Sequence, residues 1–175
     1  MRKLRAMVDH ESFDALLIAN YADSGTTLGF DHNLTYLTNL GRSYPNSFLL
    51  LTADGYSLCV DRFEIERARR ESWLPQVSPA LIIGYPPDNY VRLILEALRP
   101  RPGGRRPRIG VNGRRLPSSV GLALAHVADV VDVSLAIEVA RAVKDRLEIA
   151  AIRRACQIAE AGVQVLQANL APGIT

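Results

Sequence analysis

The chain has few of the residues that form covalent cross-links or cross membranes. Its 175 residues include two cysteines, Cys59 and Cys156, with no CxxC spacing, and isolated cysteines are most often free and buried. No run of about 18 apolar residues occurs, and the basic N-terminus lacks the continuous apolar segment of a secretory signal. We therefore expect a cytoplasmic protein without a disulfide and without a membrane partner.

The signature motifs of common catalytic sites are also missing. The three histidines, His10, His32 and His126, lie far from one another and from any HExxH or cysteine spacing, whereas a zinc site needs about three or four converging ligands. No GxSxG turn, GxxxxGK[ST] phosphate loop or GxGxxG turn follows a strand. The sequence therefore predicts neither a catalytic residue nor a metal ligand in this chain.

One stretch is compositionally biased, Arg99 to Arg108, which reads "RPRPGGRRPR" in a chain of net charge +3. Clustered arginines neutralise phosphates and favour nucleic-acid binding. However, no aromatic residues are interleaved, and proline and glycine interrupt the cluster between a predicted helix and a predicted strand. We interpret it as a solvated connector and expect no nucleic-acid partner.

Apolar runs alternate between strand and helix patterns along the first two thirds of the chain. The segment "SFLLLTADGYSLCVD" predicts two strands joined at Asp54 and Gly55, a dipeptide that tolerates a tight hairpin turn. The next segment, 62–71, predicts a helix with Phe63, Ile65 and Ala68 as its apolar positions. Further strands are predicted over 15–19, 80–85, 108–112 and 129–133, and further helices over 88–98 and 118–127. This order predicts an α/β fold whose sheet is at least partly parallel and covered on both faces.

A long amphipathic helix is predicted near the C-terminus. Asp145 and Glu148 have the spacing of a capping box at its start, and Pro172 with Gly173 cannot continue it. Such a helix must bury its apolar stripe against another element, so we expect a chain cut at a domain joint. The stripe comprises Leu147, Ala151, Ala155, Ile158, Gly162, Val165 and Leu166.

Three blocks of sequence, taken in order, resemble a known family. The first is "NLTYLTNL", 33–40, followed by the hairpin and "VDRFEIERA". The second is "RIGVN" with Leu116 six residues after Gly110, and the third runs from "VVDVSLAIEVARAVKDRLEIAAIRRACQIAEAGVQ" to "APGIT". Together they resemble the N-terminal half of the creatinase and Xaa-Pro peptidase family, which includes prolidase and aminopeptidase P and is named pita-bread after its catalytic fold.

The resemblance implies a domain organisation. Residues 1–138 would form the creatinase/prolidase-like N-terminal domain, a three-layer α/β fold with a mixed sheet, helices on both faces and a ribonuclease H-like motif. Residues 139–175 would be the linker and the first helix of a truncated catalytic domain. The family's metal ligands, two Asp, one His and two Glu, would then lie beyond Thr175, so the resemblance implies no cofactor and no activity in this chain alone.

For the full-length protein, the resemblance implies a metallopeptidase with two divalent ions, Mn, Co or Zn, that cleaves Xaa-Pro dipeptides or the N-terminal Xaa-Pro bond of peptides. The N-terminal domain would contribute to a homodimer and shape the substrate entrance. Two alternatives stay open: a domain of a creatinase-like amidinohydrolase or other small-amide hydrolase, and a noncatalytic protein-interaction module of the same fold.

The resemblance also points to two residues, Tyr36 and Arg42, as contacts with the substrate in the other subunit of the dimer. Their chemistry suits the role, because arginine binds a carboxylate bidentately and tyrosine offers a large ring with a polar tip. The alternatives are core packing at a turn for Tyr36 and a surface position for Arg42. Arg141 and Lys144 are predicted to pair with the carboxylates at the start of the last helix.

Overall fold

The computed structural model describes residues 4, 13–20, 32–40, 47–80, 87–98 and 104–170. The chain divides into two compact units, Met1–Ala140 and Arg141–Thr175. The predicted boundary between residues 138 and 139 lies two residues before this division, and both fall inside the helix Ser134–Ala142. We describe each unit by itself.

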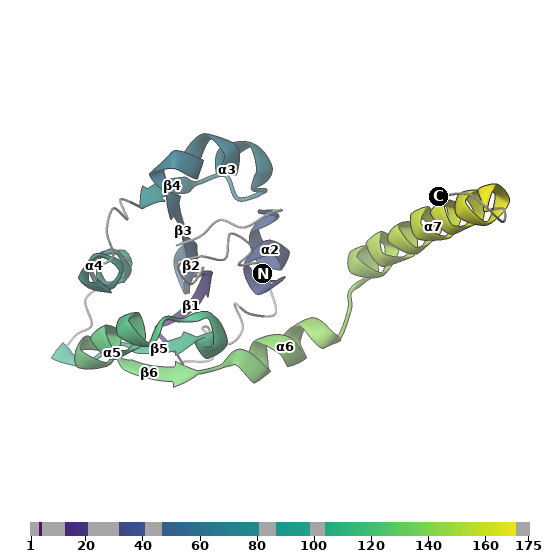
Figure 1. The fold of residues 1–175 in the computed structure, drawn as a ribbon. Coiled ribbons are helices and arrows are strands. Elements are labelled where there is room, and N and C mark those ends of the chain that lie inside the picture. Colours follow the sequence, from purple (N-terminus) through teal and green to yellow (C-terminus); the bar gives the residue numbers. More distant parts are fainter. Residues whose placement is uncertain are drawn as a thin grey trace. The chain divides into compact units, whose positions relative to one another are not determined.

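The first unit is built on a six-stranded mixed sheet in the order β4-β3-β2-β1-β5-β6 (Figure 1). Strand β2 is antiparallel to both of its neighbours, and every other pair of neighbouring strands is parallel. Five strands therefore run in one direction and β2 runs against them. The strands are β1 (Ala15–Asn20), β2 (Ser47–Thr52), β3 (Gly55–Asp61), β4 (Val77–Ala80), β5 (Arg108–Val111) and β6 (Asp129–Asp132).

Helices cover both faces of the sheet, as predicted. Alternate residues of β1 point to opposite faces: Leu16 and Ile18 belong to one apolar cluster, whereas Leu17 and Ala19 belong to the other. The first cluster is covered by α2, α3 and α6, and the second by α4 and α5 (Figure 1). The helices are α2 (His32–Thr38), α3 (Ile65–Glu71), α4 (Pro87–Ala97), α5 (Ser118–Val127) and α6 (Ser134–Ala142), with short 3-10 turns at η1 (Arg62–Glu64) and η3 (Gly113–Arg115).

The structure confirms the predicted α/β class and most of the predicted elements. The hairpin pairs β2 with β3 in a register that places Thr52 opposite Gly55, and α5 spans the predicted residues 118–127. Strand β4 starts at Val77, three residues before its predicted start, and residues 81–85 lie outside the described part of the chain. Proline is tolerated there because β4 is an edge strand.

One helix was not predicted and one local prediction was wrong. Helix α2, which begins at His32, is absent from the predicted elements because the segment is too short and too rich in threonine for its periodicity to stand out. Phe63 was expected on the apolar face of a helix, yet 78% of its surface is exposed in η1. The apolar face of the following helix is provided by Ile65 and the buried Ala68.

The second unit contains the long helix α7 (Arg146–Asn169), whose predicted start is confirmed. Asp145 accepts hydrogen bonds from the backbone of Leu147 and Glu148, and Glu148 accepts one from the backbone N–H of Asp145. Lys144 donates to the carbonyls of Arg141 and Ala142, so its predicted pairing with a carboxylate is not observed. No helix in the described ranges is long and apolar enough to cross a membrane.

Candidate functional site

The carboxyl ends of five strands lie along the same side of the sheet, which runs across the ends of the strands. Because β1, β3, β4, β5 and β6 point the same way, their carboxyl ends meet at this edge, and β2 begins there. In open α/β sheets ligands bind outside the carboxyl ends of the strands. We call this the carboxyl edge. The strand residues that lie at it are Asn20, Ser47, Asp61, Ala80, Val111 and Asp132.

Asn112, the residue after β5, fixes the end of β1 at this edge. Its Oδ1 accepts a hydrogen bond of 2.9 Å from the backbone N–H of Ala19, and its Nδ2 donates one of 3.1 Å to the carbonyl of Ala19. The side chain therefore makes the two hydrogen bonds to β1 that the backbone of β5 would make if the strand continued. Asn112 and Ala19 are both buried, so neither backbone group of Ala19 has water as a ready alternative.

Asp132 at the end of β6 stabilises the adjacent turns through hydrogen bonds to its carboxylate. Its Oδ1 accepts hydrogen bonds from the backbone N–H of Gly113 and from both the backbone N–H and the hydroxyl of Ser134. The Ser134 hydroxyl, and then its backbone N–H, hold the pKa of the Asp132 carboxyl below its usual value. A side chain at position 113 would clash, because a Cβ there would lie 2.8 Å from Cγ of Asp132. The aspartate is thus a structural acceptor committed to this turn.

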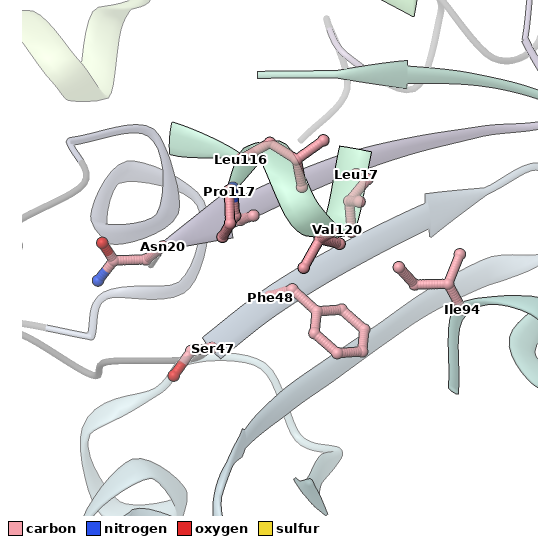
Figure 2. A pocket seen from close by; sticks show the side chains of 9 residues that line it. Leu17, Asn20, Ser47, Phe48, Ile94, Leu116, Pro117 and Val120 are labelled. Atoms are coloured by element: carbon pink, nitrogen blue, oxygen red, sulfur yellow. The ribbon is translucent and has the colours of Figure 1, made fainter. Parts of the chain in front are cut away.

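A small pocket lies beneath the carboxyl edge, lined by apolar side chains that include Leu17, Phe48, Ile94 and Val120 (Figure 2). In Figure 2 the polar ends of Asn20 and Ser47 point away from the ring of Phe48 and from Ile94, as the alternation of strand residues requires. The side chains that close the pocket are therefore apolar. A ligand site needs a few polar groups to orient its ligand, and this pocket presents none, so we interpret it as a gap in core packing between the sheet and helices α4 and α5.

Two adjacent side chains at the carboxyl edge, Arg62 and Phe63, are exposed to solvent. Asp61 ends β3 and its carboxylate accepts a hydrogen bond of 3.0 Å from the backbone N–H of Phe63. This bond fixes the turn in which the guanidinium carbon of Arg62 lies 4.5 Å from the centre of the Phe63 ring. The turn therefore presents a cation and an aromatic ring together. Sequence reasoning missed the pair because it placed Phe63 in the core.

Of the two residues predicted to contact substrate, one lies in the described part of the chain. Tyr36 lies in α2 and is half-buried against the apolar cluster on that face of the sheet. Arg42 lies outside the described residues. Their role in substrate binding stays a prediction.

The C-terminal end of α2 is held by the C-terminal end of α3. Trp73 donates its indole N–H to the carbonyl of Leu37 at 2.7 Å and its backbone N–H to Thr38 at 3.2 Å. Asn39, whose φ of 62° is in the left-handed region, donates its side-chain amide to the carbonyl of Glu71. These three bonds leave 62% of the Trp73 surface exposed while fixing its orientation.

The described residues contain no group of three or more His, Cys, Asp or Glu side chains placed to hold a metal ion. The chain's own described residues therefore do not fit a dinuclear metal centre, and we derive no metal-dependent step from them. The buried Cys59 thiol is also unsuited to metal binding or nucleophilic attack, because burial raises its pKa to about 11.

Comparison with known proteins identifies the relatives of this fold. The Creatinase/Prolidase N-terminal domain family matches residues 1–143. No curated protein matches the sequence.

Solved structures share the fold at low sequence identity. An Xaa-Pro dipeptidase from Bacillus anthracis is 20% identical, with a TM-score of 0.68 over 99% of this chain and 44% of its own. An X-Pro aminopeptidase from Thermotoga maritima is 19% identical, with a TM-score of 0.73 over 100% of this chain and 45% of its own. The Creatinase/Prolidase N-terminal domain of an X-Pro dipeptidase from Streptococcus pyogenes is 14% identical, with a TM-score of 0.55 over 78% of this chain and 94% of its own. The chain thus spans less than half the length of the first two relatives.

Proposed function

The chain belongs to the Creatinase/Prolidase N-terminal domain family, and from this premise we propose that it is the noncatalytic N-terminal domain of an Xaa-Pro peptidase. The observation that carries the proposal is the family match over residues 1–143. The shared fold of peptidases that act on Xaa-Pro substrates supports it.

The proposal assigns the chemistry to a part of the protein outside this chain. Two divalent ions held there, Mn, Co or Zn, would activate the water that attacks the amide carbonyl. The absence of a ligand group in the described residues is compatible with that division of labour, as is the coverage of 44% and 45% of two relatives. Cleavage of the Xaa-Pro bond is then a property of the full-length protein.

Within such a protein this domain would contribute to a homodimer and shape the substrate entrance of the other subunit. Arg42, with a fixed positive charge, would bind a substrate carboxylate, and Tyr36 would present its hydroxyl. The half-buried position of Tyr36 on α2 leaves part of its side chain accessible for that contact.

Activity assays on the full-length protein and on the 175-residue chain test the proposal. We expect manganese-dependent hydrolysis of Xaa-Pro dipeptides or of a tripeptide with proline in second place by the full-length protein alone. Arg42→Ala should lower kcat/KM about tenfold or more, whereas Arg70→Ala, an exposed arginine of α3, should leave it unchanged.

Two outcomes would contradict the proposal. Hydrolysis of creatine-like amides without hydrolysis of proline peptides would show that the full-length protein is an amidinohydrolase instead. Loss of all hydrolytic activity in a correctly folded, metal-loaded full-length protein would favour a binding module. Sedimentation velocity on the same sample tests the predicted homodimer independently of catalysis.

A further inference from the structure

Helix α7 carries a second apolar row in addition to the apolar stripe expected from its sequence. A helix with apolar residues on two sides has two surfaces to cover, and every side chain of this row is exposed in the described chain. The row shares only Leu166 with the expected stripe. We call it the second row, and it comprises Ile149, Ile152, Cys156, Ala159, Val163 and Leu166.

The second row has the spacing of a coiled-coil seam. Its members alternate between steps of three and four residues, which places them at the a and d positions of a heptad. In an antiparallel pair of identical helices the a residues of one copy face the d residues of the other, and a two-fold axis repeats each contact. One register then faces every member of the row with another member: Ile149 with Leu166, Ile152 with Val163, and Cys156 with Ala159.

Charges beside the second row fit the same register. Arg153 and Glu160 flank the row on one side of α7, at the two e positions of the heptad. Within the described chain neither of them forms an ion pair. In the antiparallel register Arg153 of one copy lies beside Glu160 of the other, and the two-fold axis creates this pair twice. The surface is therefore complementary to itself in charge as well as in apolar contacts.

A parallel pair of helices fits the same charges less well. It would bring Arg153 beside Glu148, whose carboxylate already accepts a hydrogen bond of 2.6 Å from the backbone N–H of Asp145 in the helix cap. It would also leave Glu160 beside Ala155, which carries no charge. The antiparallel arrangement uses both charges and leaves the cap of α7 intact, so the sequence of α7 favours it.

We propose that α7 pairs with α7 of a second copy of this chain, antiparallel, through the second row. The expected stripe, which includes Leu147 and Ile158, stays available for the part of the protein outside this chain. The inference rests on the homodimer of the proposed function and adds the surface that forms it. Two short helices make a small interface, so we expect a dissociation constant of about 10 μM.

Sedimentation velocity on the 175-residue chain, over a series of concentrations, tests the pairing. Arg153→Glu places like charges opposite each other twice and should raise the dissociation constant about tenfold. Adding Glu160→Arg to the same chain should restore the wild-type value. Arg154→Glu is the matched control, because it makes the same change of charge at the f position, on the side of α7 away from the second row, and should leave the dissociation constant unchanged.

Disulfide formation tests the orientation of the two helices. In a Cys156→Ser background, a mixture of chains carrying Ile152→Cys and chains carrying Val163→Cys should form the mixed disulfide faster than either variant forms a disulfide with itself. The buried Cys59 thiol, with a pKa of about 11, should not compete. Faster formation of the two same-residue disulfides would overturn the antiparallel arrangement.

Three results would overturn the pairing itself. One is a chain that stays monomeric throughout the series, which would mean that a part of the protein outside this chain covers the second row. Another is a dimer that Arg153→Glu weakens no more than Arg154→Glu does. The third is a full-length dimer that Arg153→Glu leaves intact.

The peptidase assay separates failure of this inference from failure of the proposed function. If the chain is monomeric and the full-length protein cleaves Xaa-Pro peptides, the inference is wrong and the peptidase function stands. If the chain dimerises through α7 and the full-length protein cleaves no proline peptide, the peptidase function fails and the interface stands.

Discussion

Replacing Asn112 by alanine should destabilise the first unit more than any exposed polar substitution. The side chain makes two hydrogen bonds to the backbone of Ala19, at 2.9 and 3.1 Å, across 93 residues of sequence. Alanine removes both bonds and leaves the N–H and the C=O of a buried residue without these partners. Asn112→Asp is the sharper variant, because it keeps the acceptor for the N–H but replaces the amide donor to the carbonyl with a second oxygen.

The expected magnitude follows from these two backbone groups. A buried polar group left unsatisfied costs about 1–3 kcal/mol, and water that enters the space left by the side chain can restore one of the two bonds. With one of the two backbone groups left unsatisfied, we expect Asn112→Ala to lower the free energy of unfolding by about 1–3 kcal/mol. Asn112→Asp should cost at least as much at neutral pH, because a buried carboxylate would face a carbonyl oxygen. The total free energy of unfolding of a native protein is only about 5–15 kcal/mol, so this loss would be a large part of it.

Urea unfolding followed by tryptophan fluorescence measures this loss, because Trp73 is the chain's one tryptophan and lies in the first unit. Asn169→Ala is the matched control: its amide also donates to a carbonyl, that of Val165, but it is exposed and lies on α7. It should shift the transition by less than about 0.5 kcal/mol. A similarly small shift for Asn112→Ala, with an unchanged denaturant slope, would refute the inference that the Asn112 side chain holds the end of β1 beside β5.

Three further predictions concern other parts of the chain. Asp145→Ala should lower the helicity of a peptide spanning residues 143–170, measured by circular dichroism, because loss of an N-cap costs about 1 kcal/mol. The pKa of Asp132 is lowered in the folded state, so its stabilising contribution is fully present above the carboxyl's unfolded pKa and is lost as pH falls through the folded value. Asp132→Asn should therefore flatten the acid limb of a stability–pH profile. A thiol reagent at pH 8 should label Cys156, which is exposed, and should label Cys59 only in denaturant, because Cys59 is buried with a pKa of about 11; labelling of both thiols in the folded chain would contradict this.

Local signals in the sequence predicted the elements whose chemistry is contained in a few neighbouring residues. The Asp54–Gly55 dipeptide predicted a tight turn between two strands, because its conformational preference requires no knowledge of the rest of the fold. The structure has that turn one residue earlier, at Ala53 and Asp54, with Gly55 already in β3 opposite Thr52 and without a positive φ. The capping box of Asp145 and Glu148 was predictable for the same reason. The alternation of strand and helix patterns predicted the α/β class and the two covered faces.

Features that depend on distant partners could not be predicted in this way. Asn112 follows a short strand and gives no local sign that its side chain bonds to Ala19. Phe63 follows the strand end and precedes a helix, so its exposure depends on how the Asp61 turn directs it. Helix α2 is short, and its end is held by Trp73 from a segment more than thirty residues away. In each case tertiary contacts override the local pattern.

The position of β1 between β2 and β5 has a consequence for how the chain folds during synthesis. The β2–β3 hairpin is local and can form within microseconds once both strands are available. Strand β1, in contrast, gains its second neighbour only when β5 has been synthesised, and its bond to Asn112 spans 93 residues. Until then β1 has an open side in the growing chain, and unpaired strand edges promote association between chains. The ribosome must therefore release the chain as far as Asn112 before β1 is paired on both sides.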